Sequence, residues 1–269
     1  MKRRFSAGYT ILEVMIVLVV TTALFVGVVS LLGGRSQQTE TTQAVRDFES
    51  KLQNIASDVA NGYYPNGFTC TADSGGSAIV LNATAIGGGT NVGCIFLGKV
   101  LALDTADTDI ITVVGRQFTS SIASTDVSTL AEAKPVAVAR SGGPDVTDTY
   151  IHKYSLQVTK MVQLSDNTTN VGAIAFITQL SGGIGGSSPV TGGRSTLLYG
   201  MAGASPNSDS VVTTAGKIDA TSSLYALPDG VRICLKGGNG QRAEITVGAG
   251  GNQTSTFVSI DNGVNSVCP

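Results

Sequence analysis

The chain has 269 residues, of which only 13% are charged, and glycine alone supplies 34. A formal net charge of −2 excludes a strongly basic protein that binds nucleic acid through a broad positive surface. The low charge and the many glycines also argue against a helical bundle or coiled coil, and they favour short strands joined by turns.

An apolar segment lies close to the N-terminus. Residues 14–32 contain no charged side chain, and no apolar run of comparable length follows. About 20 helical residues cross a hydrocarbon layer about 30 Å thick, so this segment predicts a single membrane span. The positive-inside bias then places Lys2, Arg3 and Arg4 in the cytoplasm and the chain beyond Arg35 outside.

A plain signal anchor and a cleaved secretory signal are two other interpretations of this segment. Ordinary signal-peptide cleavage requires small residues at positions −3 and −1. The pairs Ser30/Leu32 and Leu31/Gly33 fit that requirement poorly. We therefore expect no ordinary signal-peptide cleavage after the apolar run.

Glu13 is the only charged residue of the apolar region. A carboxylate at mid-bilayer costs on the order of 2.5–3.5 kcal/mol and usually has a partner. Solvation by lipid headgroups is the simpler interpretation. A partner amine is the functional one.

The residues before Glu13 form a spaced pattern. The chain begins MKRRFSAG, ending at Gly8, and continues YTILE, so that Glu13 is the fifth residue counted from Tyr9. This resembles the N-terminus of type IV pilins and related pseudopilins, in which a short basic leader ends in glycine and glutamate is the fifth residue of the mature chain. Tyr9 replaces the phenylalanine that the family more often has, and it keeps an aromatic ring.

The resemblance covers about the first fifth of the chain, and it implies a processing route. Residues 1–8 would be a leader peptide, a prepilin peptidase would cleave between Gly8 and Tyr9, and the new N-terminus of Tyr9 would be methylated. Glu13 would set the axial register of an incoming subunit by pairing with the Tyr9 amine of an assembled one.

The implied partners are further copies of this chain, other pilins, the prepilin peptidase, an inner-membrane assembly platform and, before assembly, membrane lipid. The subunit would first lie in the cytoplasmic membrane with its N-terminus inside. It would then become part of a filament at the cell surface. No nucleic-acid partner is expected.

The helix is predicted to cover residues 9–62, with a membrane half over about 9–32 and an amphipathic half over 36–60. The amphipathic half carries one apolar stripe at spacings of three and four, and Asn61 and Gly62 supply a stop. Because barely two heptads are present, packing on the chain's own sheet is favoured over a coiled-coil dimer. The stripe consists of Val45, Phe48, Leu52, Ile55 and Val59. Three glycines are expected to interrupt the helix: Gly27, Gly33 and Gly34.

Residues 63–269 are predicted to form a β-rich extracytoplasmic domain. Short apolar or alternating runs separated by turn residues indicate strands here. The expected strands are 78–81, 94–103, 110–114, 135–139, 150–162, 172–179, 195–199, 231–236, 243–247 and 255–260. The fold class is therefore α+β, with a long N-terminal helix packed on an antiparallel sheet or small sandwich.

The four cysteines all lie outside the predicted membrane half and allow three pairings. They fall into two sequence-local pairs, and we favour Cys70 with Cys94 and Cys234 with Cys268. The second loop, which almost reaches the C-terminus, resembles the C-terminal disulfide-bounded loop of many pilins. Neither pair has a C-x-x-C spacing and the chain has one histidine, so we expect structural disulfides, no metal and no cofactor.

Catalytic residues are not predicted. His152 is the sole histidine, and its serine and aspartate neighbours are too common to define a triad. Asp104, Asp107 and Asp109 lack the spacing, the glycine and the glutamate of an EF-hand, so they indicate a solvated acidic turn. We expect that the chain is not an enzyme.

The expected function is that of a structural subunit in a type IV pilus-like filament. The large domain after Gly62 favours a minor or adhesive pilin. A pseudopilin of a type II secretion system is an alternative within the same class. A membrane-anchored β-domain that binds a partner and never polymerises is an alternative of another class.

Overall fold

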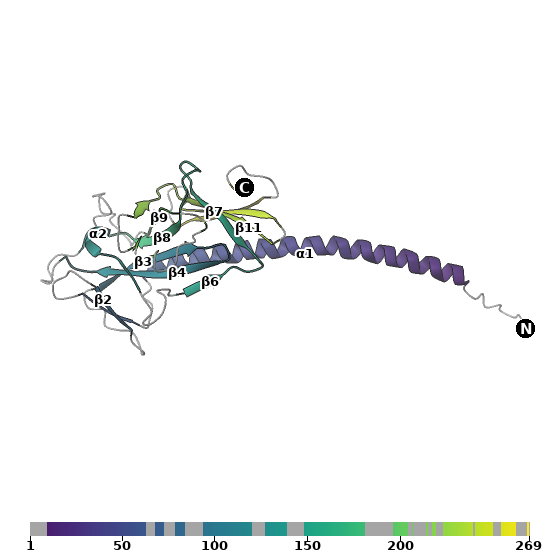
Figure 1. The fold of residues 1–269 in the computed structure, drawn as a ribbon, viewed down its shortest axis with the longest axis horizontal. Helices are drawn as coiled ribbons and strands as arrows, with labels where there is room; N and C mark the ends of the chain where they lie inside the picture. The colour runs from purple at the N-terminus through teal and green to yellow at the C-terminus, as the bar shows by residue number, and fades with distance from the viewer. Residues whose placement is uncertain are drawn as a thin grey trace, which may run out of the picture.

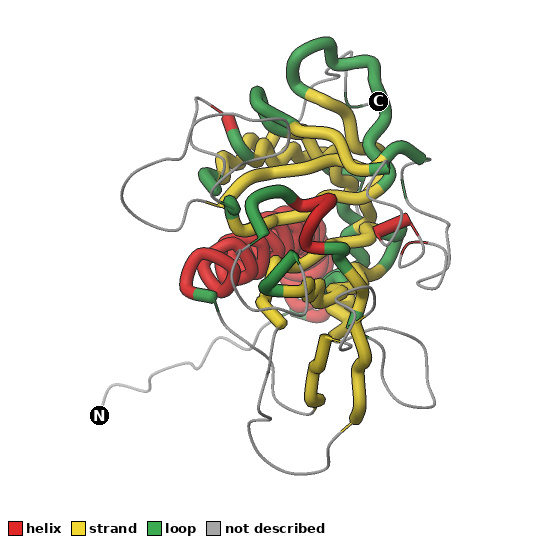
Figure 2. Tube along the Cα trace, turned by 90° about the vertical axis from the view of Figure 1, so that its left-hand side faces the viewer, coloured by secondary structure: helices red, strands yellow, loops and turns green. Residues whose placement is uncertain are grey.

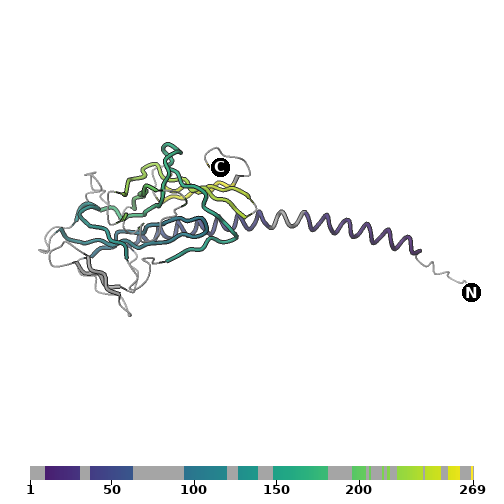
Figure 3. Tube along the Cα trace, viewed as in Figure 1, coloured from purple at the N-terminus to yellow at the C-terminus, as the bar shows by residue number. Residues whose placement is uncertain are grey.

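The structure is a computed structural model. It describes residues 10–62, 68–72, 79–83, 94–119, 127–138, 148–180, 196–203, 206, 214, 217–218, 223–238, 240–249, 254–261 and 268. The side chains of residues 31–36, 68–72, 79–83 and 261 lie outside this description. Figure 3 colours the trace by residue number.

The helix α1 (Ile11–Asn61) is continuous over 51 residues and projects far beyond the rest of the chain (Figure 1). Its side-chain cap is Thr10, and Gly62 ends it in a left-handed conformation with φ 68°. The predicted stop is confirmed. The predicted interruption is wrong, because α1 runs through all three glycines. A penalty of about 1 kcal/mol per glycine is small compared with the stabilisation that the helical turns on either side supply.

The strands form three antiparallel sheets. In order, the sheets are β1-β2, β10-β9-β8-β3-β4-β5 with β6 also paired to β4, and β13-β12-β11-β7. The strands are β1 (Phe68–Ala72), β2 (Ile79–Ala83), β3 (Cys94–Leu103), β4 (Asp107–Arg116), β5 (Val136–Ala137), β6 (Asp148–Ile151), β7 (Gln157–Gln163), β8 (Ala173–Thr178), β9 (Thr196–Met201), β10 (Leu224–Ala226), β11 (Val231–Lys236), β12 (Arg242–Val247) and β13 (Thr256–Asp261). Together with α1 they confirm the predicted α+β class.

The main core joins the second half of α1 to both larger sheets. All five residues of the predicted apolar stripe are at most 3% exposed. They share one cluster with Leu101 and Phe176 of the seven-stranded sheet and with Ile233 and Ile245 of the four-stranded sheet. Figure 2, which views α1 nearly end-on, shows strands above and below the helix.

The opposite face of the seven-stranded sheet carries a second core. Val100, Ile111 and Ala175 alternate with the side chains that face α1, and they are completely buried. The short helix α2 (Leu130–Ala133) covers part of this face with Leu130. Strands buried on both faces lose the polar alternation of a half-exposed sheet.

The predicted strand 150–162 is wrong. The chain forms β6, turns at residues 152–156, and continues as β7 in the other large sheet. Tyr154 and Ser155 adopt φ of 52° and 55°, and Leu156 N–H donates to the Lys153 carbonyl at 3.0 Å. Two consecutive positive φ values are typical of a type I′ turn. Because β6 belongs to the seven-stranded sheet and β7 to the four-stranded sheet, this turn joins the two large sheets.

Candidate functional site

The first half of α1 is the most unusual surface of the molecule. Within the described part of the chain, Ile11–Ser30 is the one helical stretch of sufficient length and hydropathy to cross a bilayer, with a mean hydropathy of 2.6 over 20 residues. None of its apolar window is buried. Fourteen large apolar side chains in this half are 48–84% exposed.

Water is a poor environment for such a helix. Complete burial of one large apolar side chain is worth about 1.5–3 kcal/mol. Fourteen side chains at these exposures therefore represent on the order of 10–25 kcal/mol. That amount matches or exceeds the net stability of about 5–15 kcal/mol that a typical domain has. The apolar half needs lipid or protein around it.

The start of α1 places Glu13 in the first helical turn. The Glu13 backbone N–H donates to the Thr10 hydroxyl at 3.4 Å, and the carboxylate lies near the positive end of the helix dipole. Among the residues that the structure describes, no cation lies within ion-pair distance of Glu13. Gly8 and Tyr9 are outside the described residues, so cleavage and methylation stay predictions.

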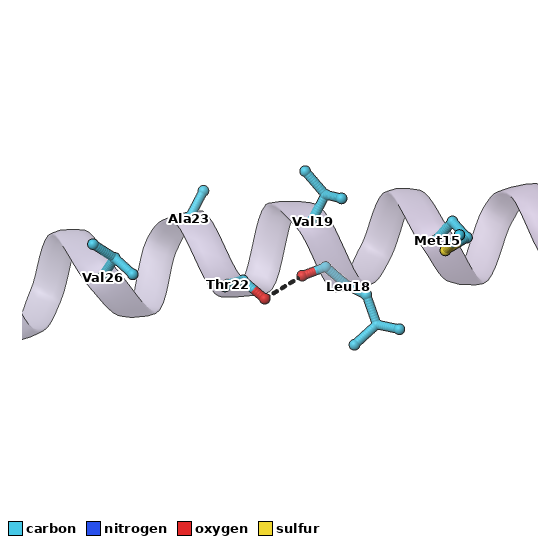
Figure 4. A pocket seen from close by; sticks show the side chains of 6 residues that line it. All are labelled: Met15, Leu18, Val19, Thr22, Ala23 and Val26. Atoms are coloured by element: carbon cyan, nitrogen blue, oxygen red, sulfur yellow. Dashed lines mark hydrogen bonds between the residues drawn. The ribbon is translucent and has the colours of Figure 1, made fainter.

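Two threonines inside the apolar half satisfy their own hydroxyl groups. Thr21 donates to the Val17 carbonyl at 2.8 Å, and Thr22 donates to the Leu18 carbonyl at 2.7 Å (Figure 4). An unpaired hydroxyl in an apolar environment is unfavourable, and these bonds remove the need for an outside partner. The half is thus compatible with lipid or with another apolar helix.

The second half of α1 is attached to the domain by ion pairs as well as by its core. Lys153 pairs with Asp47 at 2.8 Å, Asp148 with Lys51 at 2.9 Å, and Lys99 with Asp58 at 2.7 Å. The Lys99 side chain is only 12% exposed, so its pair is shielded from solvent more than the other two. Sequence reasoning missed these contacts because each joins positions 41–106 residues apart.

His152 lies where α1 meets this turn. The residue is 6% exposed, its Nε2 is 2.9 Å from the Thr108 hydroxyl oxygen, and its ring makes an edge contact with the Phe48 ring at 5.1 Å. The Nδ1 atom is buried without a hydrogen-bond partner. Burial lowers the pKa of His152 below its ordinary value. Burial therefore favours the neutral form of the ring.

Two of the three aspartates predicted for the acidic turn accept hydrogen bonds from threonines. Asp104 Oδ1 accepts from the Thr105 N–H at 2.6 Å, and Asp109 Oδ1 accepts from the Thr149 hydroxyl at 2.9 Å. Burial raises the pKa of Asp109. Within the described residues, no cluster of three potential metal ligands occurs.

The cysteines form disulfides. Cys234 of β11 is bonded to Cys268, with Cα atoms 5.3 Å apart, as predicted. Cys94 is also disulfide-bonded. The side chain of Cys70 lies outside the described residues, so its pairing with Cys94 stays a prediction. The Cys234–Cys268 bond fixes the C-terminal end of the chain to a central strand of the four-stranded sheet.

Sequence reasoning also missed the exposed turn between β6 and β7. Tyr154 and Ser155 hold positive φ values although glycine and asparagine favour such values more. A non-glycine residue in this region carries strain of about 1–3 kcal/mol, and strained residues cluster at functional sites. No turn signal in the local sequence marked this position.

No known protein family, curated protein or solved structure matches the chain.

Proposed function

We propose that this chain is a structural subunit of a type IV pilus-like filament. The observation that carries the proposal is the division of one continuous helix into a fully exposed apolar half and a half buried in a β-rich domain. A subunit of this form is suited first to a membrane and then to a bundle of like helices. Burial of the apolar halves against each other supplies the cohesion.

Processing supports assembly in this proposal. A prepilin peptidase removes residues 1–8 by cleaving between Gly8 and Tyr9, and the exposed amine of Tyr9 is methylated. Glu13 then pairs with the Tyr9 amine of a subunit that is already assembled. The unpaired state of Glu13 among the described residues supports this role, because an unpaired carboxylate in an apolar bundle is unfavourable.

The proposed course of assembly begins in the cytoplasmic membrane, with the N-terminus inside and the β-rich domain outside. An inner-membrane assembly platform extracts the subunit, and further copies and other pilins join it in a filament at the cell surface. The size of the domain favours a minor or adhesive position. The surface of that domain, not α1, would then determine what the filament contacts.

The test is the N-terminus and the location of the mature protein in its native cell. Mass spectrometry is expected to find a chain that begins with methylated Tyr9, and immunogold labelling of the β-rich domain is expected to decorate filaments. Glu13→Gln is expected to remain in the membrane and to be lost from filaments by tenfold or more, a change of about 1.4 kcal/mol or greater.

A matched control is Glu40→Gln, which removes a carboxylate from the same helix outside the apolar half. Its incorporation into filaments is expected to stay within about twofold of the unmodified chain, because a surface substitution changes stability by about 0.5 kcal/mol or less. A mature chain that starts at Met1, or a pool dispersed in the membrane without filaments, contradicts the proposal and favours a non-polymerising anchored domain. Labelling confined to a secretion complex favours a pseudopilin.

A further inference from the structure

The end of β6 and the turn that follows it each expose one large apolar side chain. In the β-rich domain, among the described residues, three large apolar side chains are exposed: Ile151 at 72%, Tyr154 at 45% and Phe257 at 66%. Two of the three therefore lie within four residues of each other. Isolated apolar side chains on a surface are ordinary, but two neighbours on one strained turn are a small contact surface.

This turn is held in a fixed position. His152, between the two exposed residues, is buried against Phe48 of α1, and its backbone N–H donates to the Ala106 carbonyl at 2.9 Å. Lys153 pairs with Asp47 of α1. Because its neighbours are anchored, the turn presents Ile151 and Tyr154 with little loss of conformational freedom on binding.

The turn lies at the end of the domain nearest the apolar half of α1. Asp148 at the start of β6 meets Lys51, and Lys153 after β6 meets Asp47, so β6 runs toward the N-terminal end of the helix (Figure 1). Seventeen residues separate Asp47 from Ser30, which make about 26 Å of helix at 1.5 Å per residue.

Lipid does not reach the turn from a membrane that holds Ile11–Ser30 upright. The headgroup layer extends only about 5–8 Å beyond the hydrocarbon core. The chain's own apolar half leads away from the domain (Figure 1). Neither lipid nor the chain's own apolar half therefore covers Ile151 and Tyr154, and in a filament a neighbouring copy is the remaining apolar partner.

The apolar half of α1 offers a complementary surface. A shallow hollow on this bare helix is lined by Met15, Leu18, Val19, Thr22, Ala23 and Val26. Figure 4 shows the short side chain of Ala23 between Val19 and Val26 on this helix. A small residue between larger ones admits an incoming side chain, and methionine adapts its shape to it.

We infer that, in the filament proposed above, Ile151 and Tyr154 dock on the apolar half of α1 in a second copy of this chain. The turn lies beside Asp47, so it meets residues 11–30 of a second copy only if that copy is shifted along the filament axis, away from the membrane. The shift is about 26–54 Å at 1.5 Å per residue, and about 40 Å if the turn meets the hollow. The turn thus makes a contact along the filament axis between the β-rich domain of one copy and the apolar half of α1 in a copy that was assembled earlier. This contact covers the turn of the first copy and part of the exposed apolar half of the second.

Site-specific photo-crosslinking in the native cell tests this contact. p-Benzoylphenylalanine is placed at Tyr154, whose aromatic ring it retains, and at Phe257 as a matched control on β13. Adducts from position 154 are expected to join two copies, with the attached peptide from residues 11–30. Adducts from position 257 are expected to lack that peptide.

Several outcomes overturn the inference while the filament remains. These are filaments in which position 154 links to lipid, to the β-rich domain of another copy or to an unrelated protein, or in which it links to nothing. Absence of filaments altogether overturns the proposed function, and the docking with it. The two failures are thus distinguished by whether filaments are present.

A pair of variants measures the strength of the contact. Ile151→Thr with Tyr154→Asn keeps a β-branched residue in the strand and a residue that tolerates positive φ in the turn. Filament yield is expected to fall about tenfold or more, since burial of one large apolar side chain changes an association constant by that factor. Phe257→Thr is expected to change it less than twofold. Equal yields for both variants, with thermal unfolding of the domain unchanged, overturn the inference.

Discussion

The two halves of α1 have the same secondary structure and opposite surroundings. Over residues 11–30 every large apolar side chain is about half exposed or more, whereas in the second half Phe48 and Leu52 are completely buried. The first half is apolar on all sides, and the second confines its apolar residues to one stripe. Hydropathy alone therefore does not tell where a helix is buried. The distribution of apolar residues around the helix does.

Matched phenylalanine truncations give the sharpest test of this contrast. Phe48→Ala is expected to lower the free energy of unfolding of the β-rich domain by about 3–5 kcal/mol, because it leaves a cavity in the main core. Phe25, which is 69% exposed, is the matched position in the first half. Phe25→Ala is expected to change that free energy by less than about 0.5 kcal/mol.

Urea unfolding of the full chain in detergent, monitored by far-UV circular dichroism, measures both variants. The unmodified chain in the same detergent is the reference. Equal losses for the two variants would mean that the apolar half also packs on the domain. In that case the division of α1 into two functional halves would be incorrect.

The Cys234–Cys268 disulfide is expected to stabilise only the domain. Replacement of both cysteines by serine opens a loop with a sequence separation of 34 residues. The expected loss is about 2–4 kcal/mol of unfolding free energy. Differential scanning calorimetry measures the loss, and membrane insertion of the same variant, measured by flotation, is expected to be unchanged. A defect in insertion would show that the apolar half of α1 and the β-rich domain are coupled.

Acidification is expected to loosen the second half selectively. Burial lowers the pKa of His152 in the folded state, so the unfolded chain binds more protons below pH 6.5. His152 therefore does not lower the free energy of unfolding above about pH 6.5. This free energy decreases as the pH falls through that value toward the folded-state pKa. Nearby Asp104 and Asp107 oppose this shift but do not reverse it.

Melting temperatures between pH 7.5 and pH 5 test this dependence. His152→Gln, which stays neutral, is expected to flatten the curve over that range. A variant that keeps the full slope would assign the acid sensitivity to other groups. The helicity of the apolar half in detergent micelles is expected to be the same at both pH values.

The smallest expected effect is that of the exposed ion pair beside the turn. Lys153 is 58% exposed and Asp47 is 35% exposed, so their coupling is about 0.2–1 kcal/mol. A double-mutant cycle with Lys153→Ala and Asp47→Ala, followed by urea unfolding, measures this coupling. It is expected to weaken at high salt. A coupling well above that range would indicate that the pair is shielded from solvent.

Much of α1 was predictable from its sequence because both of its signals are local. An uncharged run and a stripe at spacings of three and four indicate the apolar half and the buried face without any knowledge of the domain. The strands 94–103 and 231–236 were predicted with the bounds that β3 and β11 have. Long apolar runs between clear turn residues explain that success.

The turn at residues 152–156 was not predictable in the same way. Tyr154 and Ser155 are residues that usually continue a strand or a loop, and neither marks a type I′ turn. Their conformation is imposed by tertiary contacts, namely the burial of His152 and the pairing of Lys153 with α1. The exposed pair Ile151 and Tyr154 depends on that turn, so it was equally hidden. The strands β1 and β10 and the helix α2 are short and were also missed.

The enclosure of the second half of α1 has a mechanical consequence. A pull on the N-terminal end acts along the helix axis, and the buried stripe and the three ion pairs oppose it together along several turns. Withdrawal of the helix thus requires that these contacts break at the same time. An edge strand pulled away from its sheet would instead break its hydrogen bonds one after another. The fold is accordingly suited to bear tension along the axis of α1.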